Sequence, residues 1–232
     1  MRTTLIFLRV ALAVVTGAWF APAFATAPAD KQPPSAAPPA PPPSAGEPVR
    51  VLGFRSAQFG MTEAQVRQAI TTDFNVPAKD VTKQQNDSEK TTTLSTDVDN
   101  LLPVAGKSRV TYILGYQTQK LVQVNVAWSV GPGRAASSEA IVEAANLLRQ
   151  HFQKKTYKPD SVLTNAQFPD GSIVVFRGSD MEGRMTLLVL GGEKLPAKGK
   201  DPAPSMKPTT LLLSYIKDAE HPDIFQIKPD AF

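Results

Sequence analysis

The amino-acid sequence predicts an α+β fold in which two helices pack on antiparallel meander sheets. Residues 62–76 and 137–158 each begin with helix-capping residues and continue with apolar side chains at helical spacing. Several other segments alternate apolar and polar residues, and this period of two indicates strands with one buried face. The order of helix, three strands, helix and three or four strands predicts a tandem α-β-β-β repeat. The alternative is one continuous antiparallel sheet with both helices on one face.

The first helix is predicted to begin after Thr62, because Thr62 and Gln65 have the spacing of a capping box. Met61 and Val66 add the hydrophobic staple that fixes how the chain enters a helix. Pro77 limits the helix at its far end. The residues that share its apolar face are Val66, Ala69, Ile70 and Phe74.

Strands are predicted to follow in the first half of the chain. Residues 78–90 are polar and predict a loop, whereas residues 91–96 and 109–116 predict strands. The clearest strand is 121–129, where valines alternate with polar residues. The short break at 117–120 predicts a hairpin between the last two strands.

The second helix is predicted after a Gly-Pro-Gly sequence at 131–133. Ser137 or Ser138 can cap it, and Glu139 stands in its first turn, where the helix dipole favours an acid. Pro159 ends it. Its apolar stripe comprises Ile141, Ala145, Leu148 and Phe152.

Further strands are predicted in the second half. A Pro-Asp-Gly turn at 169–171 separates the first two of them, and the segment 191–208 is rich in Lys and Pro and predicts a loop. The predicted strands are 162–168, 172–177, 184–190 and 209–217.

The first 48 residues predict export followed by a spacer. Residues 1–25 combine two arginines, an uncharged apolar run and a small-residue motif ending at Ala25, which is the pattern of a secretory signal peptide. Residues 26–48 are mostly Ala and Pro and predict a disordered linker of polyproline II character. The globular domain is predicted at 49–232, with candidate sub-repeats at 54–130 and 131–232.

The composition narrows the place of action and the class of partner. Cleavage after Ala25 removes two arginines and lowers the formal net charge from +4 to +2, too little to indicate nucleic-acid binding. The chain has no cysteine, so we expect neither disulfides nor an acylated anchor. The apolar run of the signal peptide is shorter than a membrane span. We therefore expect a periplasmic or secreted protein with no stable membrane anchor after cleavage.

The sequence carries no strong catalytic or metal motif, and we predict no catalytic residue, no metal ligand and no cofactor. Charged residues gather around one predicted hairpin and form the candidate binding site: Arg177, Asp180, Glu182 and Arg184. They could form a polar recognition site or an acid–base pair. The structural alternative is that they bracket a turn, with Arg177 and Arg184 paired across the two strands.

The two histidines are weaker candidates. His151 lies near the basic end of the second predicted helix, and His221 lies among three acids, Asp218, Glu220 and Asp223. Such side chains could hold a hard cation, but their spacing matches neither an EF-hand nor a zinc motif. We expect His151 to be a surface residue and the segment around His221 to be a solvent-exposed end of a strand.

Two predicted strands are apolar on both faces. In 184–190 and 209–217, large aliphatic side chains point to both sides. Coverage on both sides by other elements would explain this pattern. The alternative is an apolar sheet face that docks a partner or a second copy of the chain.

The segment from Phe59 through Gly60, Met61 and Thr62 to Val66 resembles the Gly-Met-Thr/Ser helix start of the small lipoproteins of the outer-membrane β-barrel assembly machine. The order of helix and meander is also similar to that family, and its doubling is similar to the tandem layout of β-lactamase inhibitor protein. The chain departs from the lipoprotein pattern because it has no cysteine to acylate. The domain as a whole resembles an exported Gram-negative family. The resemblance implies no functional residue here.

These observations predict an exported, non-enzymatic protein that binds an envelope protein or a second copy of itself. The alternative is a periplasmic hydrolase or a small-ligand-binding protein that uses the charged hairpin. A third possibility is a purely structural role without a specific ligand.

Overall fold

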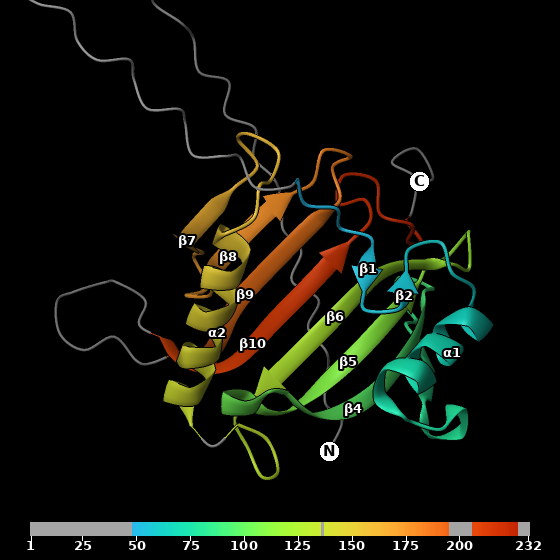
Figure 1. Cartoon of the computed structure of the whole chain (residues 1–232), viewed down its shortest axis with the longest axis horizontal. Helices are drawn as coiled ribbons and strands as arrows, with labels where there is room; N and C mark the ends of the chain where they lie inside the picture. Colours follow the sequence, from blue (N-terminus) through green and yellow to red (C-terminus); the bar gives the residue numbers. More distant parts are fainter. Residues whose placement is uncertain (1–47, 136, 195–205, 227–232) are drawn as a thin grey trace, which may run out of the picture. The chain divides into compact units, whose positions relative to one another are not determined.

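A computed structural model describes residues 48–135, 137–194 and 206–226, apart from the side chain of Lys194. Within these residues, two helices lie on an eight-stranded antiparallel sheet (Figure 1). The predicted signal peptide and nearly all of the predicted linker lie outside the described residues, as does 195–205 of the predicted loop.

The sheet is continuous. In spatial order its strands are β3 (Thr82–Gln85), β4 (Thr92–Leu102), β5 (Gly106–Leu114), β6 (Leu121–Ser129), β10 (Met206–Ile216), β9 (Met185–Lys194), β8 (Ile173–Ser179) and β7 (Leu163–Gln167). The helices are α1 (Glu63–Phe74) and α2 (Ser138–Gln153), and two short 3-10 helices are η1 (Ala78–Asp80) and η2 (Pro103–Ala105). A separate ribbon joins β1 (Gly53–Phe54) to β2 (Ala57–Gln58).

The two halves of the sheet repeat one arrangement. A helix precedes four antiparallel strands in each half, α1 before β3 to β6 and α2 before β7 to β10. The last strand of each half lies at the centre, where β6 pairs with β10 from Gln123 to Ser129. The α+β prediction is confirmed. The tandem order of helix and strands and the single continuous sheet, which were alternatives in the sequence analysis, are both present.

Both helices cover the same face of the sheet. Phe54 stacks on Phe74 of α1 and on Tyr215 of β10, with ring centroids 6.4 and 5.7 Å apart. Phe152 of α2 stacks on Phe176 of β8 at 5.4 Å. Pairing through β9 places Tyr215 and Phe176 on one side of the sheet. We call this side the helix-covered face and the opposite side the helix-free face.

The helix starts agree with their predicted caps. The Thr62 amide donates to Gln65 Oε1 at 2.9 Å and the Thr62 hydroxyl accepts from the Gln65 amide, which completes the capping box. Asn75 ends α1 in the left-handed conformation, with φ of 54°. Ser137 caps α2 by accepting from the Ala140 amide at 3.3 Å.

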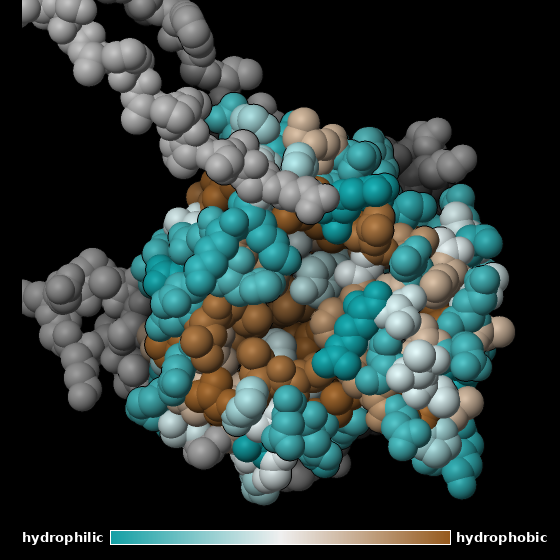
Figure 2. Space-filling view, viewed as in Figure 1, coloured by the Kyte–Doolittle hydropathy of each residue, from teal (hydrophilic) through white to brown (hydrophobic). Residues whose placement is uncertain are grey.

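The hydrophobic core lies between the helices and the helix-covered face. Apolar side chains also gather at the surface between α2 and α1 in this view (Figure 2). Large residues that are fully buried in this core include Ile70, Tyr112, Leu121, Ile141, Phe176, Leu188 and Leu211. One cluster includes residues of both halves, so the halves share a core.

Several predicted boundaries are wrong, among them the start of β10, which lies at Met206 inside the predicted loop 191–208. Residues 82–85, predicted as loop, form β3, whose four residues are all exposed and therefore show no apolar alternation. Residues 97–102 extend β4 beyond its predicted end. β9 continues past the predicted stop at Gly191 because Gly192, with no side chain, lets the backbone of Lys207 approach closely.

Candidate functional site

The charged hairpin between β8 and β9 centres on Asp180. Asp180 is fully buried, and its carboxylate accepts from the amides of Glu182 and Arg184 at 3.1 and 2.9 Å. Arg184 Nε donates to Asp180 Oδ2 at 2.7 Å, and Arg184 Nη2 pairs with Glu182 Oε2 at 2.5 Å. Burial works against the charged guanidinium, but these two carboxylates raise the pKa of Arg184. Three of the four predicted site residues therefore lie together.

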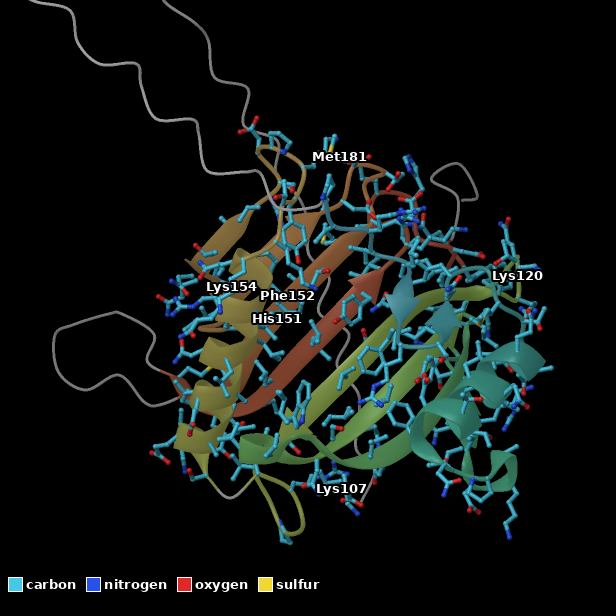
Figure 3. The ribbon with its side chains drawn as sticks, viewed as in Figure 1. Lys107, Lys120, His151, Phe152, Lys154 and Met181 are labelled. Carbon is cyan, nitrogen blue, oxygen red and sulfur yellow. The ribbon has the colours of Figure 1, made fainter. Side chains whose placement is uncertain are left out.

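Asp180 also reaches a distant part of the chain. The amide of Val51 donates to Asp180 Oδ2 at 2.9 Å, so the hairpin holds the segment that leads into the domain. The Asp180 carboxylate thus accepts four hydrogen bonds from its own chain. At the tip of the same hairpin, Met181 is 62% exposed (Figure 3). The buried part of the hairpin acts as a structural anchor, and the exposed part is small.

Arg177 lies elsewhere. The register places Arg177 opposite Leu187 and Leu163, on the helix-free face. The expected pairing of Arg177 with Arg184 is therefore wrong, because the β8–β9 pairing ends at Ser179 and Met185 and Arg184 lies in the turn between the strands. Arg177 forms no ion pair within the described part of the chain.

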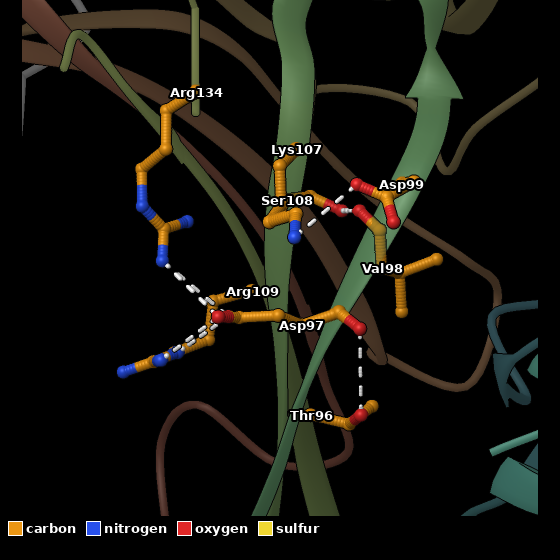
Figure 4. A network of polar contacts seen from close by, with 8 residues as sticks. All are labelled: Thr96, Asp97, Val98, Asp99, Lys107, Ser108, Arg109 and Arg134. Atoms are coloured by element: carbon orange, nitrogen blue, oxygen red, sulfur yellow. Dashed lines mark hydrogen bonds and ion pairs between the residues drawn. The ribbon is translucent and has the colours of Figure 1, made fainter. Parts of the chain in front are cut away.

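Asp97 organises a second polar cluster, on the first half of the helix-free face. Arg109 Nε lies 2.8 Å from Asp97 Oδ1, and Arg134 Nη2 lies 3.3 Å from Asp97 Oδ2 (Figure 4). Burial works to raise the pKa of Asp97, but the two guanidinium groups hold it below its usual value. Lys107 pairs with Asp99 nearby at 3.5 Å. The acidic side chains of this cluster are therefore paired with its basic side chains.

The histidines do not form a metal site in the described residues. His151 is exposed on α2, and partial burial together with Lys155 and Lys154 lowers its pKa. His221 Nδ1 lies 3.7 Å from Asp218 Oδ1, and both side chains are largely exposed. Across 48–135, 137–194 and 206–226, no group of three acidic, histidine or cysteine residues is arranged to hold a metal ion.

Asp223 has a different role from the other acids of the tail. Its carboxylate accepts from the amides of Gln117 and Thr118 at 2.8 and 3.1 Å and from the Thr118 hydroxyl at 2.6 Å. Its backbone oxygen accepts from the Tyr116 amide at 2.9 Å. Beyond it, Phe225 packs edge-on against Tyr116 at 5.6 Å. Asp223 therefore straps the C-terminal segment to the β5–β6 hairpin.

We expect this strap to loosen in acid. Burial works to raise the pKa of Asp223, but the Thr118 and Gln117 hydrogen bonds outweigh it and hold the pKa below the ordinary 3.8. A carboxylate whose folded-state pKa is lowered stabilises the fold above its unfolded pKa and loses that effect as pH falls through the folded value. Amide hydrogen exchange at Gln117 and Thr118, corrected for the intrinsic rate, is thus expected to accelerate below about pH 4.

Asp223→Asn is expected to show the same acceleration at neutral pH. Loss of hydrogen bonds to a charged acceptor costs about 1.5 kcal/mol, which corresponds to roughly tenfold faster exchange. Asp218→Asn provides the control, because the contacts of Asp218 with the described residues are local, to the Glu220 and His221 amides and to the His221 ring. Equal exchange rates in the Asp223 variant and the parent protein would contradict the strap.

A cavity of about 310 Å³ lies beside the anchored N-terminal segment. Residues 48–51 and Gly53 form one wall, and Phe152 and Lys155 from the end of α2 form another. Phe152 lies on the side of α2 that faces the sheet (Figure 3). Tyr157, Thr186 and Tyr215 complete the lining. The cavity therefore combines aromatic rings with three hydroxyl groups.

Burial raises the pKa values of the two tyrosines of this cavity. It raises the pKa of Tyr157 to about 12, although a hydrogen bond with Thr186 works in the opposite direction. Burial, with a smaller contribution from Tyr157, also raises the pKa of Tyr215. Both phenols therefore keep a proton to donate at neutral pH. The sequence analysis missed these residues, because no local motif links Tyr157, Thr186 and Tyr215.

The second half of the helix-free face is apolar. Met185, Leu187 and Val189 of β9 alternate with residues that point into the core, and Leu212 and Ile216 of β10 lie beside them. Four of these side chains remain partly exposed, namely Met185, Leu187, Leu212 and Ile216. No helix or strand among the described residues packs over them. β9 and β10 are apolar on both faces, and the described helices cover one of these faces.

Comparison of the chain with protein-family models, curated proteins and solved structures finds no match. The resemblance to the assembly-machine lipoproteins therefore stays a prediction. Among the residues that the structure describes, no helix combines the length and the hydropathy that a membrane crossing requires.

Proposed function

We propose that the chain is an exported, non-enzymatic binding module of the periplasm that docks a protein partner on its helix-free face. The observation that carries this proposal is the apolar surface of β9 and β10 on that face. Partly exposed Met185, Leu187, Leu212 and Ile216 lie at neighbouring positions of two paired strands, with the buried Ser214 opposite Leu187. Contiguous apolar surface of this kind is typical of protein interaction sites.

The two halves of this face differ in a way that favours a defined docking area. On β4, β5 and β6 it presents mainly polar residues such as Thr93, Ser95 and Asn125, and the charges around Asp97 are paired internally. On β9 and β10 it presents mainly aliphatic residues. An apolar centre beside a polar margin is the usual anatomy of a protein interface.

Arg177 indicates the chemistry of the partner. It borders the apolar area opposite Leu187, and within the described residues it has no acidic partner. A partner that offers an apolar surface with an acidic residue at its edge would pair with Arg177 and exclude water from the leucines. A second copy of the chain would place Arg177 beside apolar residues or another cation, so a different protein fits this face better.

Site-specific photo-crosslinking in intact cells tests the proposal. A crosslinking residue at position 187 is expected to trap one reproducible envelope protein. The matched control is position 93, since Thr93 is also partly exposed and lies on the polar half of the same face. Trapping of the same protein equally at both positions, or of none at position 187, would argue against docking on β9 and β10. A crosslinked product of twice the chain's mass would show self-association instead.

Arg177→Glu and Leu187→Glu are expected to abolish that crosslink from a neighbouring position such as 212, while the purified variants keep their thermal stability within a few degrees. Ser95→Glu, on the polar half, is the control and should leave the crosslink intact. A crosslink that survives Arg177→Glu would show that the partner does not bind through an acidic residue opposite Arg177.

A further inference from the structure

We infer that the cavity between residues 48–53, the end of α2 and the ends of β9 and β10 binds a small aromatic carboxylate. This site lies on the helix-covered face and is separate from the proposed docking surface. A volume of about 310 Å³ is at the lower end of known ligand sites, so it suits a small molecule.

Aromatic rings held in fixed positions form the apolar part of the site. Phe152 stacks on Phe176 at 5.4 Å, and Tyr157 contacts the same Phe176 at 5.1 Å. Tyr215 stacks on Phe54 at 5.7 Å. These contacts fix the positions of three rings that line the cavity, Phe152, Tyr157 and Tyr215, so the apolar part of the site is preorganised.

The charges around the cavity select an anion. Among the described residues of the lining, Arg50 and Lys155 are charged and none is Asp or Glu. Lys155 Nζ lies 6.0 Å from the centroid of the Phe152 ring, which places a cation beside the aromatic wall. Asp180, which holds the neighbouring Val51, already accepts from Arg184 and from the Val51 amide. A ligand carboxylate would therefore meet cations that have no competing acid in the lining.

Hydroxyl groups supply the directional contact. Tyr157 and Thr186 both line the cavity, and both are buried residues with a hydroxyl group. The Tyr215 hydroxyl has no hydrogen-bond partner among the described residues, and its proton is retained at neutral pH. A phenol that donates to a carboxylate forms a charge-assisted hydrogen bond, which is stronger than one between neutral groups. Tyr215 would thus orient the carboxylate, while the rings hold the body of the ligand.

The N-terminal wall of the site depends on the charged hairpin. The Val49 amide donates to the Thr156 oxygen at 2.8 Å, and Val51 is held by Asp180. Asp180 and Arg184 do not line the cavity, but they position the residues that do. The charged hairpin identified in the sequence would then support a ligand site without touching the ligand.

Titration of the mature protein with benzoate, followed by NMR, tests the inference. Benzoate is expected to shift the signals of Lys155, Tyr157 and Tyr215 with a dissociation constant near about 1 mM, and benzyl alcohol, its neutral counterpart, is expected to bind at least about tenfold more weakly. Inorganic phosphate, an anion without a ring, should bind no better than benzyl alcohol. Leu187→Glu should leave benzoate binding unchanged, so failure of the docking proposal and failure of this one are distinguishable.

Two variants test the assigned residues. Tyr215→Phe keeps the ring that stacks on Phe54 and removes only the hydroxyl, so it is expected to weaken benzoate binding by about tenfold without loss of folding. Lys155→Gln should have a similar effect, whereas Lys158→Gln, outside the lining, should have none. Equal binding of benzoate and benzyl alcohol, or unchanged affinity in Tyr215→Phe, would overturn the assignment. Absence of any shift at about 10 mM benzoate would overturn the site itself.

Discussion

Asp180→Ala is expected to lower the free energy of unfolding by about 3–5 kcal/mol, the usual cost of removing one partner from a buried ion pair. The substitution leaves the Val51 amide without its acceptor and leaves the Arg184 guanidinium, only 19% exposed, without its buried partner. For a domain of this size the melting temperature should fall by about 10 °C. Chemical denaturation of the purified mature protein, followed by circular dichroism, measures the change.

Glu182→Ala provides the matched control for Asp180→Ala. Glu182 belongs to the same hairpin and also pairs with Arg184, but its side chain is 60% exposed. An exposed ion pair contributes little, so this substitution should cost less than about 1 kcal/mol. Similar losses in the two variants would mean that the hairpin acts through its surface charges rather than through the buried anchor.

Phe176→Ala is expected to cost about 3–5 kcal/mol, the range found for large aromatic residues in well-packed cores. Phe176 is fully buried and contacts both Phe152 and Tyr157, so the cavity created would remove support from α2 and from the chain that follows it. The free energy of unfolding is measured in the same way as for Asp180→Ala.

Phe168→Ala makes the same chemical change at a half-buried position in the turn between β7 and β8. Because less apolar area is lost there, we expect a clearly smaller decrease in the free energy of unfolding. If Phe168→Ala were as destabilising as Phe176→Ala, the packing of α2 on β8 would not be the main contribution of Phe176.

Local signals in the sequence were sufficient for the helices and for the central strands. The capping box at Thr62 and the cap at Ser137 depend on residues within three positions of each other, and the alternation in 121–129 is visible without any partner strand. β3 gave no such signal, because an edge strand with four exposed polar residues is specified by pairing with β4 rather than by burial.

The sites were less predictable than the fold. The sequence brings Asp180, Glu182 and Arg184 together, since they share one turn, but the bond from the Val51 amide spans 129 positions and has no local signature. The aromatic cavity likewise joins the N-terminal segment to the end of α2 and to β9 and β10. Arg177 was misplaced because the turn between β8 and β9 takes up residues 180–184, so that Arg184 has no partner on β8 and Arg177 lies opposite Leu187.

The position of β10 has a consequence for how the chain acquires its structure. β6 can pair with β5 once residue 129 is available, but its second neighbour, residues 206–216, lies far along the chain and joins it only when β10 forms. Until then β6 has an unpaired edge, and the first half lacks the strand that would close it. Such long-range pairing is slow to form, so we expect the first half to keep this edge exposed during folding until β10 docks beside it.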